Sequence, residues 1–444
     1  WGEYKQHGVY NIINFRWDNK YILNLSARRD GSSRFGPGSQ FGNFGSVGLS
    51  WIASDEKWMQ NILPDFVSFL KFRGSYGVTG KDAGEDYGYI TRWASSYDLN
   101  GYDRIYDYNG GRGFSIARSI NPEYGWESAN KLELASTISF FKDRLSVDLS
   151  WYRNRIGNQI TGVNTPSYTG WPSVTANWDA VVQNSGLELS VNARVLNTKD
   201  WTLSVNANFS RNRNLLHSYP GLEYSSYAST YKVGKPLTTS YLFRYTGIDP
   251  LTGNYTFEDR NKDGWVSQGF GQIPVNEEDD RYIEFDRAIR WQGGFGATAS
   301  YKNFSLYLNF VYKKQPAQDP FQNLVVGTMV NFEMPDEIKN NHWQEPGDQA
   351  IYPRYTTGGI PGPFSNSDGA WVDGSYLRLN TLSISYDLPA RWMKKIKMNG
   401  CRFSADTQNL FVISSYKGID PEVQSLLGAT PLSRVISTSL TFNF

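Results

Sequence analysis

The chain has 444 residues, of which 44 are basic and 43 are acidic, so its formal net charge is +1. This balance excludes the Lys/Arg excess of an extended nucleic-acid-binding surface, and we expect no nucleic-acid partner. The single cysteine, Cys401, excludes an internal disulfide framework and a cysteine-based zinc site.

Aromatic residues make up 16% of the chain and glycine occurs 42 times, which favours strands and turns over a helical bundle. The length would ordinarily suggest two or three soluble domains. No run of about 18 apolar residues occurs, so we predict no membrane-spanning helix. A transmembrane β-barrel stays possible, because it needs only alternate residues to be apolar.

Alternation of apolar and polar side chains, typical of a strand with two different faces, recurs along the whole chain. Residues 201–210, for example, read WTLSVNANFS, in which every second residue is apolar and the others are Thr, Ser or Asn. Several alternating segments approach the length of roughly 10 residues that a tilted strand needs to cross a bilayer. The pattern predicts strands over residues 7–16, 20–29, 43–53, 67–77, 130–141, 144–155, 184–196, 200–212, 290–301, 303–313, 376–387, 400–411 and 434–444.

One of these strands changes phase. In 376–387 the apolar residues Leu377 and Leu379 occupy odd positions, whereas Leu382 and Ile384 occupy even ones. We therefore predict a β-bulge in this strand. Further hairpins hidden in 86–97 or 238–258 would raise the strand count.

The connections between the predicted strands alternate in length. The shorter ones cover 17–19, 54–66, 142–143, 197–199, 302 and 388–399. The longer ones cover 30–42, 78–129, 156–183, 213–289, 314–375 and 412–433. Outer-membrane barrels sort their connections in this way, into short periplasmic turns and long extracellular loops. The first strand then runs toward the periplasm, and the last one ends there at Phe444.

Aromatic residues lie near several strand ends, where they predict interfacial girdles on a membrane barrel, although aromatic residues are also common in soluble strands. They are Trp17, Tyr21, Trp51, Trp151, Tyr152, Trp201, Tyr301, Tyr386 and Phe411. The odd number of strands and a start at Trp1, without Met or a signal peptide, suggest an internal fragment of a larger barrel.

A series of ordered motifs resembles the SusC/RagA family of TonB-dependent outer-membrane transporters. The motifs are RRDGSSRFG (28–36), GNFGSVGLSWIASDEKW (42–58), LKFRGSYGVTG (70–80), the hairpin of 121–160 entered by Trp126-Glu127, QNSGLELSV (183–191), VGKPLTTSYLFRYTGIDPLTGNYTFEDRNKDG (233–264), SYLRLNTLSISYDLP (375–389) and QNLFVISSYKGIDPEV (408–423). The resemblance spans nearly the whole chain. It departs locally at Gly80-Lys81, where the family commonly has Gly-Asn, and at Phe44-Gly45-Ser46, where it has an FPS-like turn.

The resemblance implies an all-β, transmembrane antiparallel barrel of about 22 strands with a plug. Residues 1–444 would be its C-terminal part, and 22 − 13 = 9 strands, the plug and the TonB-contacting segment would lie upstream. It also implies a location in the bacterial outer membrane, surrounded by membrane lipid. The implied function is TonB-energised import of an oligosaccharide or oligopeptide, with a SusD-like surface lipoprotein as partner. A passive porin or adhesion barrel and a soluble carbohydrate-binding all-β protein are the alternatives.

The sharpest local motif for a metal is DRNKDG at 259–264. Oxygen-bearing side chains occupy its first, third and fifth positions and glycine its sixth, as at the start of a calcium-binding loop. The candidate ligands are Asp259, Asn261, Asp263 and the backbone carbonyl of Trp265. Phe270 occupies the twelfth position, where a bidentate Glu is usual, and an acid from 277–280 would have to replace it. A tight polar turn without metal is the alternative.

Aromatic residues in two long loops are candidate substrate contacts, because flat rings stack on sugars beside amides and hydroxyls. They are Tyr168, Trp171 and Trp178 in 156–183, and Trp343 and Trp371 in 314–375, with Tyr352, Tyr355 and Phe364 nearby. They would alternatively pack the loops or contact a partner protein. The histidines, His7, His217 and His342, are scattered and no nucleophile motif accompanies them, so we expect no enzyme activity.

Overall fold

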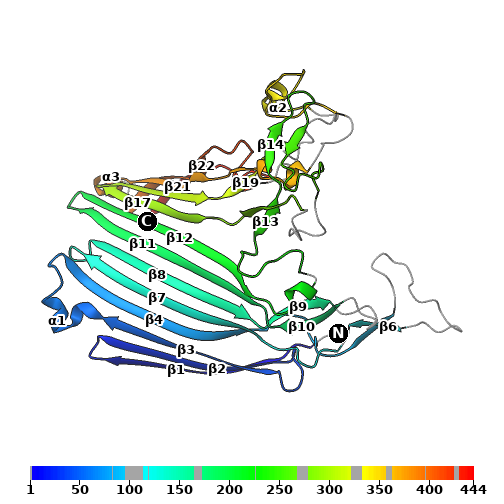
Figure 1. The fold of residues 1–444 in the computed structure, drawn as a ribbon. Helices are drawn as coiled ribbons and strands as arrows, with labels where there is room; N and C mark the ends of the chain where they lie inside the picture. The colour runs from blue at the N-terminus through cyan, green and yellow to red at the C-terminus, as the bar shows by residue number, and fades with distance from the viewer. Residues whose placement is uncertain are drawn as a thin grey trace.

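The computed structural model describes residues 3–82, 84–95, 114–118, 120–164, 173–225, 227–267, 279–321, 333–356, 363–395, 397–424 and 430–444. Thirteen strands form one antiparallel sheet in which each strand pairs with its sequence neighbours in the sheet, from β1 to β23. The sheet curves into an open half-cylinder (Figure 1). Among the described residues, β1 pairs only with β2 and β23 only with β22.

The thirteen strands confirm the number predicted from the alternation. They are β1 (Gln6–Trp17), β2 (Tyr21–Ser32), β3 (Phe41–Ile52), β4 (Val67–Lys81), β7 (Glu127–Phe140), β8 (Leu145–Gly157), β11 (Val181–Asn197), β12 (Trp201–Ser218), β17 (Trp291–Tyr301), β18 (Phe304–Lys314), β21 (Tyr376–Asp387), β22 (Gly400–Ser414) and β23 (Val435–Asn443). The largest boundary differences are in β4 and β12, which extend beyond the predicted spans at the long-loop end. At 17 and 18 residues, β11 and β12 exceed the roughly 10 residues that cross a bilayer.

Short and long connections lie at opposite ends of the sheet, as predicted. The short ones share the end that carries α1 (Lys57–Gln60) and α3 (Ala390–Lys395), and the long ones gather at the other end (Figure 1). The tight turns use left-handed backbone, with positive φ at Asp18, Asn19 and Lys302. Such turns match the twist of the strands that they join.

The long connections contain small structures of their own. Their strand pairs are β5 (Arg92–Ser95) with β6 (Phe114–Arg118), β9 (Gln159–Asn164) with β10 (Ser173–Trp178), β13 (Thr239–Leu242) with β16 (Ile283–Asp286), β14 (Tyr245–Ile248) with β15 (Tyr255–Phe257), and β19 (Pro316–Gln318) with β20 (Trp371–Asp373). Helix α2 (Asp336–Asn341) and the short 3-10 turns η1 (Ala53–Asp55), η3 (Leu222–Tyr224), η4 (Phe364–Asn366) and η5 (Asp368–Ala370) complete the elements. The segments 86–97 and 238–258 thus do contain strands, but these stay outside the main sheet and leave its count unchanged.

The predicted bulge is confirmed. Asn309 of β18 pairs with Thr381, and the next residue, Phe310, pairs with Leu379, so Asn380 is the extra residue in β21. The same position shifts the register against β22. The extra residue keeps the apolar side chains of β21 on the same face of the sheet before and after the change of phase.

The two faces of the sheet differ in chemistry. Apolar residues that oppose one another across strands, such as Leu23, Leu49 and Leu134, share one face of the sheet, which we call the outer face. Arg73, Glu133 and other polar residues occupy the intervening positions, on the inner face. Tyr152 belongs to this inner set, so its prediction as a girdle residue was wrong: Glu133 and Gly186 are its opposite residues, and it alternates with the outward Trp151.

No helix in the described part of the chain is long and apolar enough to span a membrane.

Candidate functional site: the rim and the inner wall

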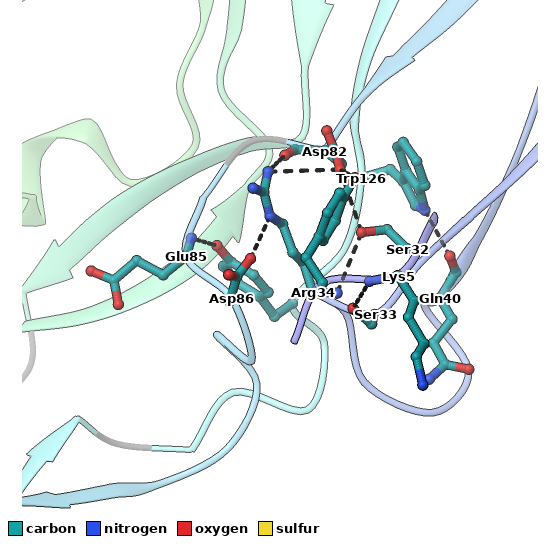
Figure 2. Close-up of polar contacts among 11 residues, drawn as sticks. Lys5, Ser32, Ser33, Arg34, Gln40, Asp82, Glu85, Asp86 and Trp126 are labelled. Atoms are coloured by element: carbon teal, nitrogen blue, oxygen red, sulfur yellow. Dashed lines mark hydrogen bonds and ion pairs between the residues drawn. The ribbon is translucent and has the colours of Figure 1, made fainter. Parts of the chain in front are cut away.

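The motif at 28–36 holds the rim of β2 and β3 against the connection that follows β4 (Figure 2). Arg34 donates from Nε to Asp86 Oδ1 at 2.8 Å and from Nη1 to the Asp82 carbonyl at 2.8 Å. Ser32 Oγ donates to Asp82 Oδ2 at 3.4 Å, and Tyr4 adds a 2.6 Å bond to the same carboxylate oxygen. One guanidinium therefore fixes the paths of two loops.

Beneath this polar cluster lies an aromatic one. Phe35 is fully buried, with ring centroids 5.6 Å from Tyr124 and 5.2 Å from Trp126. Trp126 Nε1 donates to the Gln40 carbonyl at 3.2 Å, which Figure 2 shows. Gly84 has a φ of +108°, and a Cβ there would lie 1.6 Å from the Tyr124 hydroxyl, so only glycine fits.

The hairpin β9–β10 is attached to the same rim. Asn177 accepts a hydrogen bond from the Gly125 N–H at 2.8 Å and donates to the Gly125 carbonyl at 3.0 Å. Trp178, a predicted substrate contact, donates from Nε1 to the Pro220 carbonyl at 3.1 Å. Tyr168 and Trp171, the two other candidates in this loop, lie outside the described residues.

The DRNKDG loop is closed by its own side chains. Asp259 accepts hydrogen bonds from the N–H groups of Lys262 at 2.7 Å and Gly264 at 2.8 Å, and Asp263 accepts one from Trp265 at 2.8 Å. Asp280, fully buried, accepts the N–H groups of residues 260 and 267 at 2.8 Å each and anchors the loop. Phe270 and residues 277–278 lie outside the described residues, so the remaining candidate ligands are placed only in part.

A second group of loops packs around three aromatic rings. Tyr255 and Phe364 stack with ring centroids 4.1 Å apart, and Tyr245 meets the Phe364 ring edge-on at 5.2 Å. Burial raises the pKa of Tyr245 to about 12, so its phenol stays neutral at physiological pH. Trp371 packs against this cluster.

Trp343 and Trp371, the two candidates in loop 314–375, have different surroundings. Trp343 donates from Nε1 to the Pro250 carbonyl at 2.9 Å, over Gly253, whose backbone is left-handed. Trp371 has a buried Nε1 with no hydrogen-bond partner among the described residues. It lines a cavity of 250 Å³ with Phe285, Arg290 and others.

An ion pair borders this cavity. Lys314 Nζ lies 2.6 Å from Asp373 Oδ2. Partial burial opposes ionisation of Asp373, but hydrogen bonds from Lys314 and Ser375 outweigh it and lower the pKa of the Asp373 carboxyl to about 2. An aromatic wall beside a guanidinium and a paired carboxylate is suited to an amide- or hydroxyl-bearing ligand.

The polar inner wall carries a larger cavity, of 690 Å³, across β4, β7, β8, β11 and β12. Arg73 lies 3.5 Å from Glu133, and Tyr152 donates to Asn212 Oδ1 at 2.8 Å. Further polar lining comes from Lys131, Asn154, Asn184 and Glu188. Sequence alternation placed these residues on the polar face but could not show that residues from five strands border one hollow.

The three histidines lie in separate places, His7 in β1, His217 in β12 and His342 beyond α2, where it stacks on Tyr355 at 4.1 Å. In the part of the chain that the structure describes, no three His, Cys, Asp or Glu side chains form a metal-binding group. The candidate site in the described structure consists of the polar inner wall and the packed aromatic rim.

Comparison with known proteins agrees with this architecture. The model of the family described as TonB dependent receptor-like, beta-barrel matches residues 1–410. TonB-dependent receptor P3 of Formosa agariphila is 27% identical over 93% of the chain, and TonB-dependent receptor SusC of Bacteroides thetaiotaomicron is 24% identical over 96%. The solved RagAB peptide transporter superposes with a TM-score of 0.79 at 25% identity over 100% of the chain.

These matches cover only part of each relative. The chain spans 42% of both receptors and 48% of the RagAB transporter chain, so it corresponds to somewhat less than half of their length.

Proposed function

Because the chain belongs to the family of TonB dependent receptor-like β-barrels, and specifically resembles its SusC/RagA members, we propose that it forms part of an energised importer of large nutrients. The family places it in the bacterial outer membrane as an antiparallel barrel. Its outer face contacts lipid, and its inner face lines the path of the substrate. Transport changes no covalent bond of the substrate, and we assign no catalytic residue.

The observation that carries the proposal is the contrast between the two faces of the sheet. The 690 Å³ hollow of the inner wall combines charged side chains of both signs with amides and a phenol. Such a surface can exchange hydrogen bonds with a hydrated solute without holding it tightly, as passage requires. The apolar outer face, by contrast, suits a hydrocarbon environment.

The substrate class we propose is an oligosaccharide or an oligopeptide. Among the relatives, the RagAB protein is a peptide transporter by name, whereas the names of the matching receptors specify no substrate. Both substrate classes present amides or hydroxyls that the inner wall could bond. We propose a SusD-like surface lipoprotein as partner at the long-loop end, and TonB as the energy source, acting through a plug.

The loop aromatics remain our proposed substrate contacts. They are Tyr168, Trp171, Trp178, Trp343 and Trp371. Trp371 is the best supported, because it lines a cavity beside Arg290 and has an unpartnered indole N–H within the described structure. The indole N–H groups of Trp178 and Trp343 already bond backbone carbonyls, so only their ring faces remain for a ligand.

Uptake by cells carrying the complete receptor tests this function. Labelled pools of neutral oligosaccharides and of oligopeptides are offered to cells with the receptor, without it, and with it but without TonB. We expect accumulation of one pool only when both receptor and TonB are present. Accumulation that persists without TonB would identify a passive pore, and cell adhesion without uptake would identify an adhesion barrel.

The same assay tests the rim contact. Trp371→Ala should raise the substrate concentration needed for half-maximal uptake while leaving the amount of receptor in the membrane unchanged. Trp201→Ala is the matched control, because Trp201 begins β12 at the short-connection end of the sheet, opposite the cavity, and is 48% exposed. Equal uptake by the two variants would remove Trp371 from the substrate path.

A further inference from the structure

The outer face of the sheet carries an apolar groove of 590 Å³ across β1, β2, β3, β4 and β7. Its walls consist of large apolar side chains that oppose one another across neighbouring strands. The main ones are Phe15, Leu23, Leu49, Trp51, Phe72 and Leu134. Phe15, Leu49 and Leu134 are each more than half exposed in the described structure, so the groove opens outward.

A glycine makes the hollow. Gly74 of β4 pairs with Leu49 on one side and with Leu134 on the other, so it occupies an outward position between two leucines. A Cβ at Gly74 would lie 3.3 Å from the Leu134 Cδ2 atom and 3.9 Å from the Glu133 carbonyl oxygen, with no other atom of the described residues within 4 Å. Space for a larger side chain is therefore present, and the absence of one at this position leaves the groove open.

The groove begins at the end of the sheet that carries the short connections. Trp17 and Tyr21 flank the first tight turn with ring centroids 5.6 Å apart, and Trp51 stacks on Phe72 at 5.9 Å and on Trp58 of α1 at 6.1 Å. Short connections face the periplasm in outer-membrane barrels, and aromatic residues gather at the membrane interface. The mouth of the groove therefore lies at the inner leaflet of the outer membrane.

The charges beside this mouth are nearly balanced. Lys20 Nζ lies 2.8 Å from Asp18 and 3.5 Å from Glu56. The two segments at the mouth, 18–20 and 53–57, carry Lys20 and Lys57 against Asp18, Asp55 and Glu56, a net charge of 2 − 3 = −1. Arg73, which also lines the groove, lies 3.5 Å from Glu133 and is paired with it. An anionic headgroup would meet no excess of cations here, whereas a zwitterionic one can pair with both signs.

We propose that the groove binds one acyl chain of an inner-leaflet phospholipid with a zwitterionic headgroup. The groove is continuous with the lipid-contacting face of the barrel, so its natural occupant is a component of the membrane. Surrounding lipid is as apolar as the groove, so the hydrophobic effect does not distinguish a bound chain from a free one. Retention comes from van der Waals contact, because a chain in the groove touches ring and leucine atoms on several sides.

A second copy of the chain suits the groove less well. A stable protein interface needs roughly 1,200–2,000 Å² of buried surface. The protruding side chains of each partner must also fit the hollows of the other. The groove is instead a hollow lined by residues of five strands, and two such hollows placed face to face in a symmetric dimer would not fill one another.

Native mass spectrometry of the complete receptor, extracted from outer membranes in mild detergent, tests the proposal. We expect a wild-type species that carries one phospholipid, with phosphatidylethanolamine as its headgroup class. Gly74→Leu fills the groove from its floor, and Leu134→Trp narrows it from one wall. We therefore expect neither variant to carry the bound phospholipid. Val195→Phe is the control, because Val195 is exposed at the short-connection end of β11, outside the groove.

Heat-modifiable migration in gels confirms that each variant has folded before its lipid is counted. Equal lipid retention by wild type and both groove variants overturns the proposal, as does a wild type without retained lipid. Retention of lipid A overturns the assignment to the inner leaflet. Loss of a receptor dimer in the groove variants, with lipid unchanged, overturns it in favour of a second copy. None of these outcomes depends on uptake, so the transport proposal stands or fails separately.

Discussion

The Arg378 guanidinium lies 2.6 Å from the Asp420 carboxylate, and both side chains are almost completely buried. Arg378 comes from β21, whereas Asp420 comes from the long connection between β22 and β23. The Gln315 side chain donates to the Pro421 carbonyl at 2.8 Å, and Lys313 reaches Glu422 at 2.8 Å. Three attachments thus hold the last long loop against β21, β18 and Gln315, the residue that follows β18.

Removal of one partner of this buried pair should be costly. Arg378→Ala leaves the Asp420 carboxylate buried without its cation, which typically lowers the free energy of unfolding by about 3–5 kcal/mol. Arg402→Ala is the matched control, because its pair with Asp387 at 2.7 Å is exposed and worth at most about 1 kcal/mol. Urea unfolding of the refolded barrel, with protease cleavage within 415–424 as a local readout, measures both. Equal losses for the two variants would contradict this assignment.

The aromatic cluster under the 28–36 motif should be a second point of sensitivity. Phe35→Ala removes a fully buried ring that contacts Tyr124 and Trp126, and such a deletion costs about 3–5 kcal/mol. Phe41→Ala removes a phenylalanine that is 52% exposed, so its cost should be much smaller. Unfolding in urea compares the two, and a Phe35→Ala barrel as stable as the control would show that the rim does not depend on this ring.

The Lys314–Asp373 pair predicts a local dependence on acid pH. An unfolded aspartate titrates near about 3.9, whereas the pKa of Asp373 in the folded protein is about 2. The contribution of the Lys314–Asp373 pair to stability is therefore complete at a pH above the pKa of the unfolded aspartate. It is lost as the pH falls from that value toward the lower pKa of Asp373 in the folded protein. Both side chains are partly exposed, so the effect is small and weakens with salt.

Hydrogen exchange of the 371–376 segment measures this effect. Wild type and Asp373→Asn are compared at the same pH, so that the intrinsic pH dependence of exchange cancels. Wild type should be better protected at neutral pH, and the difference should vanish as the pH approaches 2. A difference that is constant over that range would show that ionisation of Asp373 does not hold this segment.

We propose that the DRNKDG loop binds calcium through Asp259, Asn261, Asp263 and the Trp265 carbonyl. Asp259 and Asp263 accept backbone N–H bonds, and Asn261 Nδ2 donates to Asp263 Oδ2 at 2.8 Å, so all three side chains lie within one turn. Calorimetry should detect calcium binding that Asp259→Asn weakens strongly. Asp249→Asn is the control, because Asp249 also accepts bonds from its own turn, from Leu251 N–H and Thr252 Oγ1, but has no DxNxDG spacing. Absence of binding at the millimolar calcium typical of extracellular modules, about 1 mM, would refute the proposal.

Sequence reasoning was most successful where the signal was local and periodic. Alternation every two residues reports which face a side chain occupies, so it located all thirteen strands and the bulge at Asn380. Connection length was enough to sort the two ends of the sheet. Tyr152 was misassigned because its place near a strand end was weighed above its parity, which already put it on the polar face.

The rim was less predictable, because its contacts join residues that are far apart in the chain. Arg34 meets Asp86 across 52 positions, and Arg378 meets Asp420 across 42. Motif resemblance marked both segments as distinctive without showing what they touch. The same holds for Trp371, whose aromatic nature suggested a contact but whose cavity depends on β16, β19 and β20 coming together.

The sequence by itself determined thirteen strands, a sheet with one apolar and one polar face and the sorting of its loops, because these follow from side-chain parity and spacing along one chain. Only the tertiary structure decided which residues border the inner hollow, the rim cavity and the groove over Gly74. Those spaces form where neighbouring strands set side chains of unequal size beside one another. The shape and depth of these spaces depend on packing between segments that are far apart in the sequence.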